Sequence, residues 1–217
     1  MAEENKEEKV DSFIERYHQG FDTLREFGCD PNRQRLHIKI PNARELLWAG
    51  LRYYLGDRAV WLPAYDEVAA WLTDNQRRGL LCIGGNGLGK SIICQRIIPA
   101  LILKRVDYVV SCYTAVEMTQ QLDILLRLPL LSIDDIGTEP LETVNYGVRR
   151  IAFSEIVDRS EKQGTLLVLS TNLRTNHATG RDGQPIPSIE DRYGLRTYDR
   201  LRAVVKAVVF RGDSLRY

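Results

Sequence analysis

The eight residues from Gly84 to Ser91 constrain the fold of this chain more than any other segment. They read Gly84-Gly85-Asn86-Gly87-Leu88-Gly89-Lys90-Ser91 and match the pattern G-x-x-x-x-G-K-[ST] at every position. In such a loop the glycines let backbone amides turn toward phosphate oxygens, and the start of the following helix adds partial positive charge. The segment therefore predicts a strand, a phosphate-binding loop and a helix. Lys90 is expected to reach the β- and γ-phosphates, and Ser91 to be a ligand of Mg²⁺.

The pattern around this loop predicts an α/β fold, a parallel sheet flanked by helices. Short apolar segments are expected as strands over residues 80–84, 107–112, 128–133, 165–170 and 203–210. Helical spacing predicts helices over 90–103, 115–127, 145–162 and 189–201, with Pro99 as a kink or stop in the first. Three further helices are expected before the sheet, over 11–27, 43–55 and 64–72. We therefore expect a helical, partner-binding region over residues 1–60 and a nucleotide-binding domain over 61–217.

An acidic motif follows the third expected strand. Leu130-Leu131-Ser132-Ile133-Asp134-Asp135 is an apolar strand that ends in two carboxylates. Beside a phosphate-binding loop, such a strand end supplies the acidic partner of Mg²⁺. Asp134 is expected to hold the metal through a bound water, and Asp135 to polarise the attacking water. The alternative is a solvated pair of acids at a strand end.

Two polar residues further along the chain fit the same site. Asn172 ends the fourth expected strand, where its side chain can orient a water at the γ-phosphate. Together with the first two motifs, this predicts an ATPase of the additional-strand class with Asn172 as the polar sensor. Arg200 comes late in the chain and is a candidate arginine finger for a neighbouring subunit. The alternative for Arg200 is an ordinary surface arginine, and Arg196 and Arg192 are weaker candidates.

Composition limits the other roles. The formal net charge of +1 excludes a protein that coats nucleic acid by bulk charge, but it allows local basic patches. Arg77-Arg78, Arg149-Arg150 and the basic residues between 192 and 206 are either phosphate contacts or a solvated face. The four cysteines have no zinc-ligand or redox-motif spacing, and the apolar run at 97–103 is too short to span a bilayer. No apolar signal-peptide core is found near the N-terminus, so a cytoplasmic protein without a membrane role is expected.

The motifs in this order resemble those of the DnaC/IstB-like branch of AAA+ ATPases, over roughly residues 60–217. The resemblance rests on Gly-Lys-Ser, Ile-Asp-Asp-Ile-Gly, Ser-Thr-Asn-Leu, Asp-Arg-Leu and Phe-Arg-Gly-Asp-Ser-Leu-Arg. It implies an AAA+ core, ATP and Mg²⁺ as cofactors, and homo-oligomers with sites between subunits. It also implies single-stranded DNA and a partner protein as ligands. The stretch between Tyr113 and Leu130 is shorter than the helical insertion by which such members contact single-stranded DNA.

Several functions remain open at this stage. DnaC-like members load the replicative helicase, which makes that helicase the expected partner, whereas IstB-like members are helper ATPases for transposition. A small-molecule kinase is a third hypothesis, with residues 174–192 as a lid, but the acidic pair and Asn172 suit water attack better. A switch that binds ATP without turnover is a fourth. A GTPase is not expected, because the guanine motif Asn-Lys-x-Asp is missing from the sequence.

Overall fold

The computed structural model describes residues 4–26, 34–145, 147–175, 178–179, 185–212 and 214–215, and the chain divides into two compact units. The first unit, Met1–Gln34, is described by helix α1 (Glu4–Glu26). This helix confirms the one expected over 11–27 and begins earlier. Its apolar positions Phe13, Ile14 and Tyr17 are 56%, 47% and 66% exposed. The second unit, Arg35–Tyr217, contains the sheet and all the motifs.

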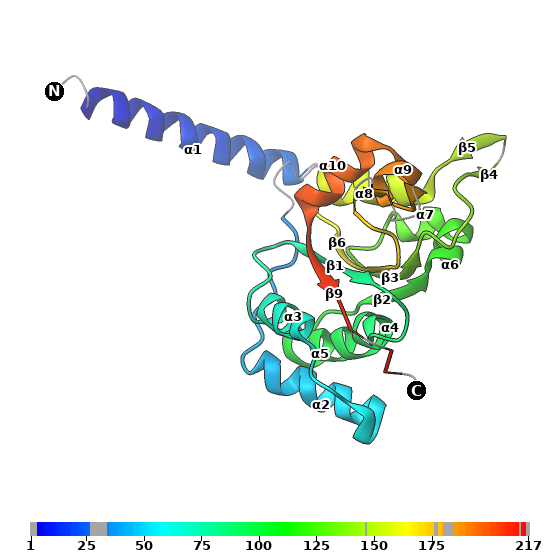
Figure 1. Ribbon diagram of the computed structural model, residues 1–217. Coiled ribbons are helices and arrows are strands. Elements are labelled where there is room, and N and C mark those ends of the chain that lie inside the picture. Colours follow the sequence, from blue (N-terminus) through cyan, green and yellow to red (C-terminus); the bar gives the residue numbers. More distant parts are fainter. Residues whose placement is uncertain are drawn as a thin grey trace. The chain divides into compact units, whose positions relative to one another are not determined.

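Five parallel strands form the sheet of the second unit, in the order β2-β3-β6-β1-β9 (Figure 1). Their bounds are β1 (Gly79–Gly84), β2 (Ser111–Thr114), β3 (Leu130–Ile136), β6 (Leu166–Thr171) and β9 (Val205–Phe210). Strand β6 lies between the P-loop strand β1 and the acidic-motif strand β3. This is the additional strand that the order of the motifs predicted. It brings the carboxyl ends of three motif-bearing strands to one edge of the sheet.

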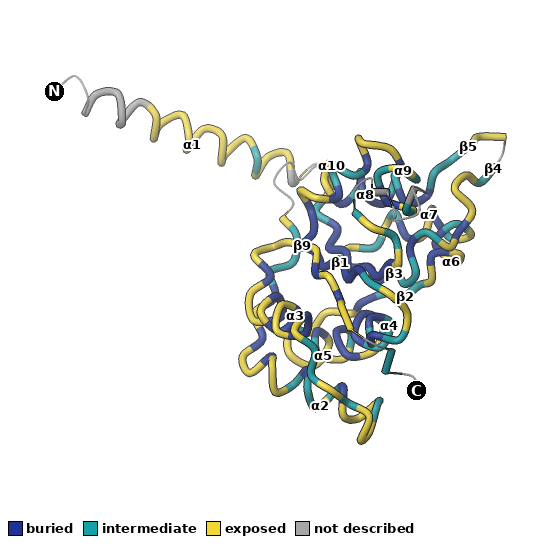
Figure 2. Tube along the Cα trace, viewed as in Figure 1, coloured by how far each residue is buried: buried dark blue, intermediate teal, exposed yellow. Residues whose placement is uncertain are grey.

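Helices cover both faces of this sheet, which confirms the predicted fold class. One layer consists of α2 (Ala43–Leu55), a 3₁₀ turn (Gly56–Arg58), α3 (Pro63–Thr73) and the P-loop helix, which runs as α4 (Lys90–Ile92), a π-helical turn (Ile93–Ile97) and α5 (Ile98–Val106). The other consists of α6 (Ala115–Gln120), α7 (Leu122–Leu125), α8 (Ala152–Gln163), α9 (Ile189–Tyr193) and α10 (Leu195–Val204). Along β1, Leu80 and Cys82 face the first layer, and Leu81 and Ile83 face the second. The sheet is therefore buried on both sides (Figure 2), as parallel sheets are.

Helix α2 belongs to the compact second unit. Its residues Leu47 and Leu51 are buried in the same core as Val68 of α3. The extended segment before it is also attached, because the Ile40 N–H donates to the Leu72 carbonyl at 3.0 Å. The unit therefore begins at Arg35, whereas the sequence placed the start of the nucleotide-binding domain at residue 61. The partner-binding role assigned to residues 1–60 stays a prediction.

The helix expected over 145–162 is wrong in its first part. Residues Thr143–Asn145 and Val148–Arg150 form an antiparallel hairpin, β4 and β5, and α8 begins only at Ala152. Gly147 has φ +79°, a left-handed conformation that suits a turn. Arg150 then fixes the hairpin through ion pairs with Asp123 at 2.7 Å and Glu155 at 2.6 Å. The pair Arg149-Arg150 is thus divided, since Arg149 is exposed and Arg150 is occupied by carboxylates.

Smaller differences concern interruptions of helices. The P-loop helix does not stop at Pro99 but continues to Val106, with the π-helical turn directly before the proline. The helix expected over 189–201 is divided at Gly194, which has φ +84°. The segment expected as a loop over 174–187 lies partly outside the described residues and includes the short strands β7 (Ala178–Thr179) and β8 (Pro185–Ile186). Within the described residues, no helix combines the length and apolar character needed to cross a bilayer.

Candidate functional site

The P-loop connects β1 to α4 and depends on its glycines. Gly87 and Gly89 have φ +81° and +79°, in the left-handed region that favours glycine. A Cβ on Gly87 would collide with Ser214, and a Cβ on Gly89 would lie 2.9 Å from the Tyr65 hydroxyl oxygen. The loop therefore has the close backbone packing and the turn geometry of a phosphate cradle.

Lys90 joins the P-loop to the predicted sensor. Its Nζ donates to the carbonyl oxygens of Gly84 at 2.8 Å and Gly85 at 2.7 Å, and to Asn172 Oδ1 at 3.0 Å. Asn172 Nδ2 in turn donates to Asn86 Oδ1 at 3.0 Å. The Lys90 side chain is buried, and burial lowers its pKa, while the negative charge of Asp135 opposes this shift. Lys90 and Asn172, two predicted site residues that are distant in sequence, are thus in direct contact.

The acidic pair sits in a β-bulge that the sequence did not reveal. The register between β3 and β6 shifts between Ile133 and Ile136, and Asp135 has φ +55°. Bulges beside active sites re-aim side chains, and here Asp135 lines the same pocket as Lys90 and Ser91, with a volume of about 100 Å³. Asp134 and Asp135 follow one another in the chain, yet only the bulge lets both reach the P-loop edge.

Ser170 holds this pair in place, and sequence reasoning missed it. Its Oγ donates to Asp134 Oδ1 and accepts the backbone N–H of Asp135 at 3.0 Å. Ser170 is buried in β6, two residues before Asn172. The signal in the sequence was a small hydroxyl residue inside an otherwise apolar buried strand.

The donor set fits Mg²⁺ bound together with phosphates. Ser91 offers a hydroxyl and Asp134 and Asp135 offer carboxylates, which are the oxygen ligands that Mg²⁺ prefers. Among the described residues no group of three or more His, Cys, Asp or Glu side chains could cage a metal by itself. In nucleotide sites Mg²⁺ is usually bound by one or two carboxylates together with the phosphates of the substrate.

Two supports of the P-loop come from distant parts of the chain. The Tyr65 hydroxyl of α3 donates to the Leu88 carbonyl at 3.1 Å, and burial raises the pKa of Tyr65 to about 12. The Leu215 N–H near the C-terminus donates to the Gly87 carbonyl at 2.9 Å, and Leu215 lines the P-loop pocket. Neither support was predicted from the sequence. Arg216, the last residue of the Phe-Arg-Gly-Asp-Ser-Leu-Arg motif and a weak candidate for contact with the nucleotide or a neighbouring subunit, lies outside the described residues.

Arg200 is not among the residues that the fold brings to this pocket. Its Nη1 pairs with Asp158, and its Nε lies 3.0 Å from Glu161, both on α8. An arginine finger acts on the site of another subunit, so contacts within one chain do not test this role for Arg200, which stays a prediction. In that role Arg200 would first have to leave its ion pairs with Asp158 and Glu161.

A buried acid connects the end of β3 to α9. Glu139 is 3% exposed, and its carboxylate accepts the Gly137 N–H at 2.8 Å and the Tyr193 hydroxyl. Burial, together with this bond, raises the pKa of Tyr193. Arg192 donates to the Glu139 carbonyl, so this weaker finger candidate also has a partner within the chain. The loop after the acidic motif is thereby fixed to the segment that carries the candidate arginines.

Comparison with known proteins gives similarity in structure only. No protein-family model and no curated protein matches the sequence. Similar solved structures include the DnaC helicase loader, at 14% identity and a TM-score of 0.47, covering 80% of this chain and 93% of that one. Another is DnaI, at 18% identity and 0.45, covering 64% and 73%. A third is AMPPCP-bound DnaA from Aquifex aeolicus, at 14% identity and 0.44, covering 80% and 48%.

Proposed function

We propose that this protein binds and hydrolyses ATP with Mg²⁺ at the carboxyl edge of its sheet. The observation that carries the proposal is the contact of Lys90 Nζ with Asn172 Oδ1 at 3.0 Å, within the P-loop. Lys90 and the polar end of β6 thus lie side by side, next to the pocket that Asp135 lines, and this arrangement supports the proposal. This combination suits phosphoryl transfer, whose catalysis consists mainly of positioning and electrostatic stabilisation.

Each residue has a distinct role in this proposal. The phosphate oxygens of ATP replace the carbonyls of Gly84 and Gly85 as acceptors of the Lys90 ammonium. Ser91 would hold Mg²⁺ with its hydroxyl and Asp134 would hold it through a bound water, and the ion would neutralise charge on the phosphates. Asp135 orients and polarises the attacking water, and Asn172 positions it from the neighbouring strand. Water is the acceptor, which distinguishes the site from that of a small-molecule kinase.

The test compares binding with turnover. Lys90→Ala should abolish nucleotide binding, measured with a fluorescent ATP analogue, because the only buried ammonium at the described pocket is removed. Asp135→Asn should retain binding and lose phosphate release. Normal hydrolysis by Asp135→Asn would remove the assigned role of Asp135. Phosphate release from wild-type protein without any added acceptor separates an ATPase from a kinase.

At a finer level we propose a DNA replication accessory protein, a DnaC-like helicase loader that acts in the cytoplasm as a homo-oligomer when nucleotide is bound. Its partner would be a replicative helicase, docked through the N-terminal region. The exposed apolar positions Phe13, Ile14 and Tyr17 of α1 support a docking role, since contiguous exposed apolar surface commonly marks interaction sites. Single-stranded DNA is a further ligand in this proposal. The short α6–α7 stretch offers little surface for it.

An IstB-like transposition helper is the second candidate, because it shares every motif of the core. The partner decides between the two. Full-length protein should retain a replicative helicase in a pull-down with purified components, and Phe13→Ser/Tyr17→Ser should lose it while hydrolysing ATP normally. Retention of a transposase instead would favour the second candidate.

A further inference from the structure

Cations from three separate segments meet at the amino-terminal edge of the sheet, opposite the P-loop edge. Arg78 directly precedes β1, Arg202 is in the last turn of α10 before β9, and Arg35 begins the extended segment before α2. Arg78 Nη2 donates to the Arg202 carbonyl at 2.7 Å, and Arg77 Nη1 donates to the Arg35 carbonyl at 3.1 Å. Lys206, in β9 beside Leu80, completes the set. Arg35, Arg77, Arg78, Arg202 and Lys206 are called the basic cluster below.

The positive charge of this cluster is not neutralised within the described chain. None of its members forms an ion pair with a carboxylate of the described residues. Two nearby acids are engaged elsewhere, Asp74 with His37 at 2.9 Å and Glu161 with Arg200 at 3.0 Å. Burial lowers the pKa of Arg35, Glu161 opposes this, and the charge of Arg78 lowers it further. Arg35 Nε is also buried without a hydrogen-bond partner. Such a concentration of like charge favours an anionic ligand.

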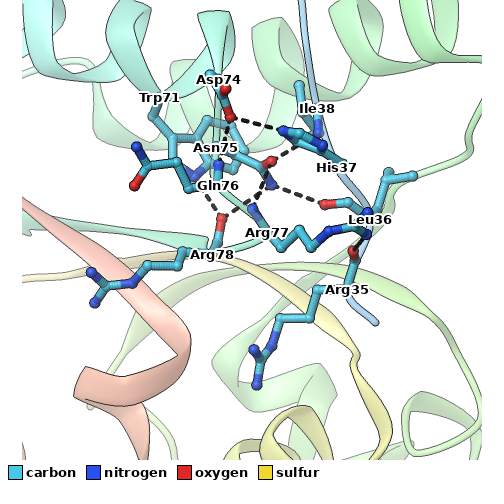
Figure 3. Close-up of polar contacts among 10 residues, drawn as sticks. All are labelled: Arg35, Leu36, His37, Ile38, Trp71, Asp74, Asn75, Gln76, Arg77 and Arg78. Atoms are coloured by element: carbon cyan, nitrogen blue, oxygen red, sulfur yellow. Dashed lines mark hydrogen bonds and ion pairs between the residues drawn. The ribbon is translucent and has the colours of Figure 1, made fainter. Parts of the chain in front are cut away.

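A strained turn presents two of these arginines. Gln76 and Arg77 have φ +47° and +57°, a left-handed conformation that is unfavourable for residues other than glycine. Asn75 keeps the turn in this shape: its Oδ1 accepts the N–H groups of Ile38 and Arg77, at 2.8 and 3.1 Å (Figure 3). Its Nδ2 donates to the carbonyls of Leu36 and Arg78 at 3.0 and 3.2 Å. Strain that is maintained by surrounding bonds is concentrated at functional sites.

Stabilisation of helix ends explains only part of the cluster. Arg202 in the last turn of α10 interacts favourably with the helix dipole. Arg78 satisfies two carbonyls at the end of that helix, those of Arg202 and Val205. Arg35 Nη2 also donates to the Ser160 carbonyl in the last turn of α8 at 2.8 Å, and Lys206 Nζ donates to the Glu67 carbonyl of α3 at 3.4 Å. These bonds go to neutral carbonyls and leave the positive charges without a carboxylate partner among the described residues.

We propose that the basic cluster binds the phosphate backbone of duplex DNA. Sites for single strands combine positive charge with exposed aromatic rings on which bases stack. The rings nearest the cluster are not free for stacking, because Trp71 is buried and the Arg202 guanidinium lies 5.6 Å over the Tyr198 ring. Guanidinium groups without such rings suit backbone contacts, which are independent of sequence. This contact would add to the proposed function a DNA-binding surface that is remote from the nucleotide site. The choice of duplex DNA as the ligand rests on the proposed role in DNA replication, whereas the need for an anionic ligand rests on the charge of the cluster alone.

The test uses the full chain and a fluorescein-labelled duplex without nucleotide, with affinity measured by anisotropy over a range of salt concentrations. Arg77→Gln/Arg202→Gln removes two cations, so the slope of log K against log[salt] should fall by about 1.8. The matched control is Lys104→Gln/Arg105→Gln, which changes the net charge equally at two exposed positions of α5. Asp199→Asn should tighten binding, because this exposed acid lines a pocket with Arg78 and Arg202.

Three outcomes would overturn the proposal. The first is that Arg77→Gln/Arg202→Gln unfolds at the same temperature as the wild type and binds the duplex equally well. The second is that the control variant loses as much duplex affinity as Arg77→Gln/Arg202→Gln. The third is that only a single-stranded oligonucleotide, or only the acidic polypeptide polyglutamate, responds to the substitutions. If Arg77→Gln/Arg202→Gln does not fold, the direction of the Asp199→Asn effect decides. Lys90→Ala should bind the duplex normally, so failure here is distinguishable from failure of the proposed ATPase.

Discussion

Ser170→Ala removes the group that positions both acids of the proposed active site. In the wild type, the Ser170 hydroxyl donates to the Asp134 carboxylate and accepts the Asp135 N–H at 3.0 Å. Asp135 needs this anchor because it lies in a bulge with φ +55°, a conformation that a non-glycine residue adopts at a cost. Alanine leaves the shape of the strand unchanged, so the effect isolates the loss of two hydrogen bonds.

The expected magnitude follows from these two bonds. A hydrogen bond to a charged group contributes about 1.5–3 kcal/mol and a neutral one about 0.5–1.5 kcal/mol, so the free energy of unfolding should fall by about 2–4 kcal/mol. If about 1.4–2.8 kcal/mol of positioning is also lost from the transition state, kcat falls by about 10- to 100-fold. Nucleotide affinity should change little, because the described hydrogen bonds of Lys90 go to Gly84, Gly85 and Asn172 and none of them involves Ser170.

The assay measures steady-state phosphate release, nucleotide affinity and urea unfolding for each variant. Ser132→Ala is the matched control, since Ser132 is equally buried in the adjacent strand and makes two hydrogen bonds. These are a donation to the Cys94 carbonyl at 2.8 Å and an acceptance from Gln95 Nε2 at 3.0 Å. It should lose similar stability and keep kcat. Equal kcat values for Ser170→Ala and wild type, or equal losses in both variants, would refute the positioning role.

Three further predictions concern other parts of the chain. Tyr65→Phe should remove a loss of stability at alkaline pH. In the wild type the folded-state pKa of Tyr65 is raised to about 12, so the stability contributed by its neutral hydroxyl is complete below pH ~10 and is lost as pH rises through ~12. Urea unfolding of both proteins at pH ~10 and pH ~12 checks this. Asn75→Ala removes four hydrogen bonds of a buried side chain and should lower the free energy of unfolding by about 2–6 kcal/mol, whereas exposed Gln76→Ala should change it by less than about 0.5 kcal/mol in the same denaturant titration. Arg200→Ala should lower ATP turnover only in mixed oligomers where it faces an intact neighbouring site. Wild-type rates in such mixtures would exclude it as the finger.

Local patterns were sufficient to predict the sheet but not its details. The P-loop, the acidic strand end and Asn172 each follow a short apolar strand, so their order predicted the additional strand β6 between β1 and β3. The bulge at Asp135 was not predictable, because it depends on the register with β6, a contact between segments far apart in the chain. The hairpin β4–β5 had a local signal in Gly147 and the valines around it. That signal was overlooked because the neighbouring residues also continue the helical spacing of α8.

The contacts that support the site were the least accessible to sequence reasoning. Tyr65, Ser170 and Leu215 lie in segments distant from the P-loop. Tyr65 and Leu215 each contact it through one hydrogen bond, and Ser170 contacts the acidic pair through two. A single hydroxyl or N–H leaves no periodic pattern and no motif, so its role emerges only from the fold. The same holds for the basic cluster, in which Arg77 and Arg202 are well separated in sequence and are joined through Arg78.

These supports also bear on how a nucleotide could affect the rest of the chain. The Leu88 carbonyl is held by Tyr65 of α3, and the Gly87 carbonyl is held by Leu215. Leu55 at the end of α2 and Leu215 near the C-terminus are both part of the wall of the P-loop pocket. A nucleotide bound there would therefore lie against residues of α2 and of the C-terminal segment, next to the loop that Tyr65 of α3 holds. Because Leu88 and Tyr65 are bonded directly, a shift of the loop reaches α3 without an intermediate residue. We therefore expect Tyr65→Phe to weaken any effect of ATP on the helices before the sheet, because it removes the hydrogen bond that joins the loop to α3.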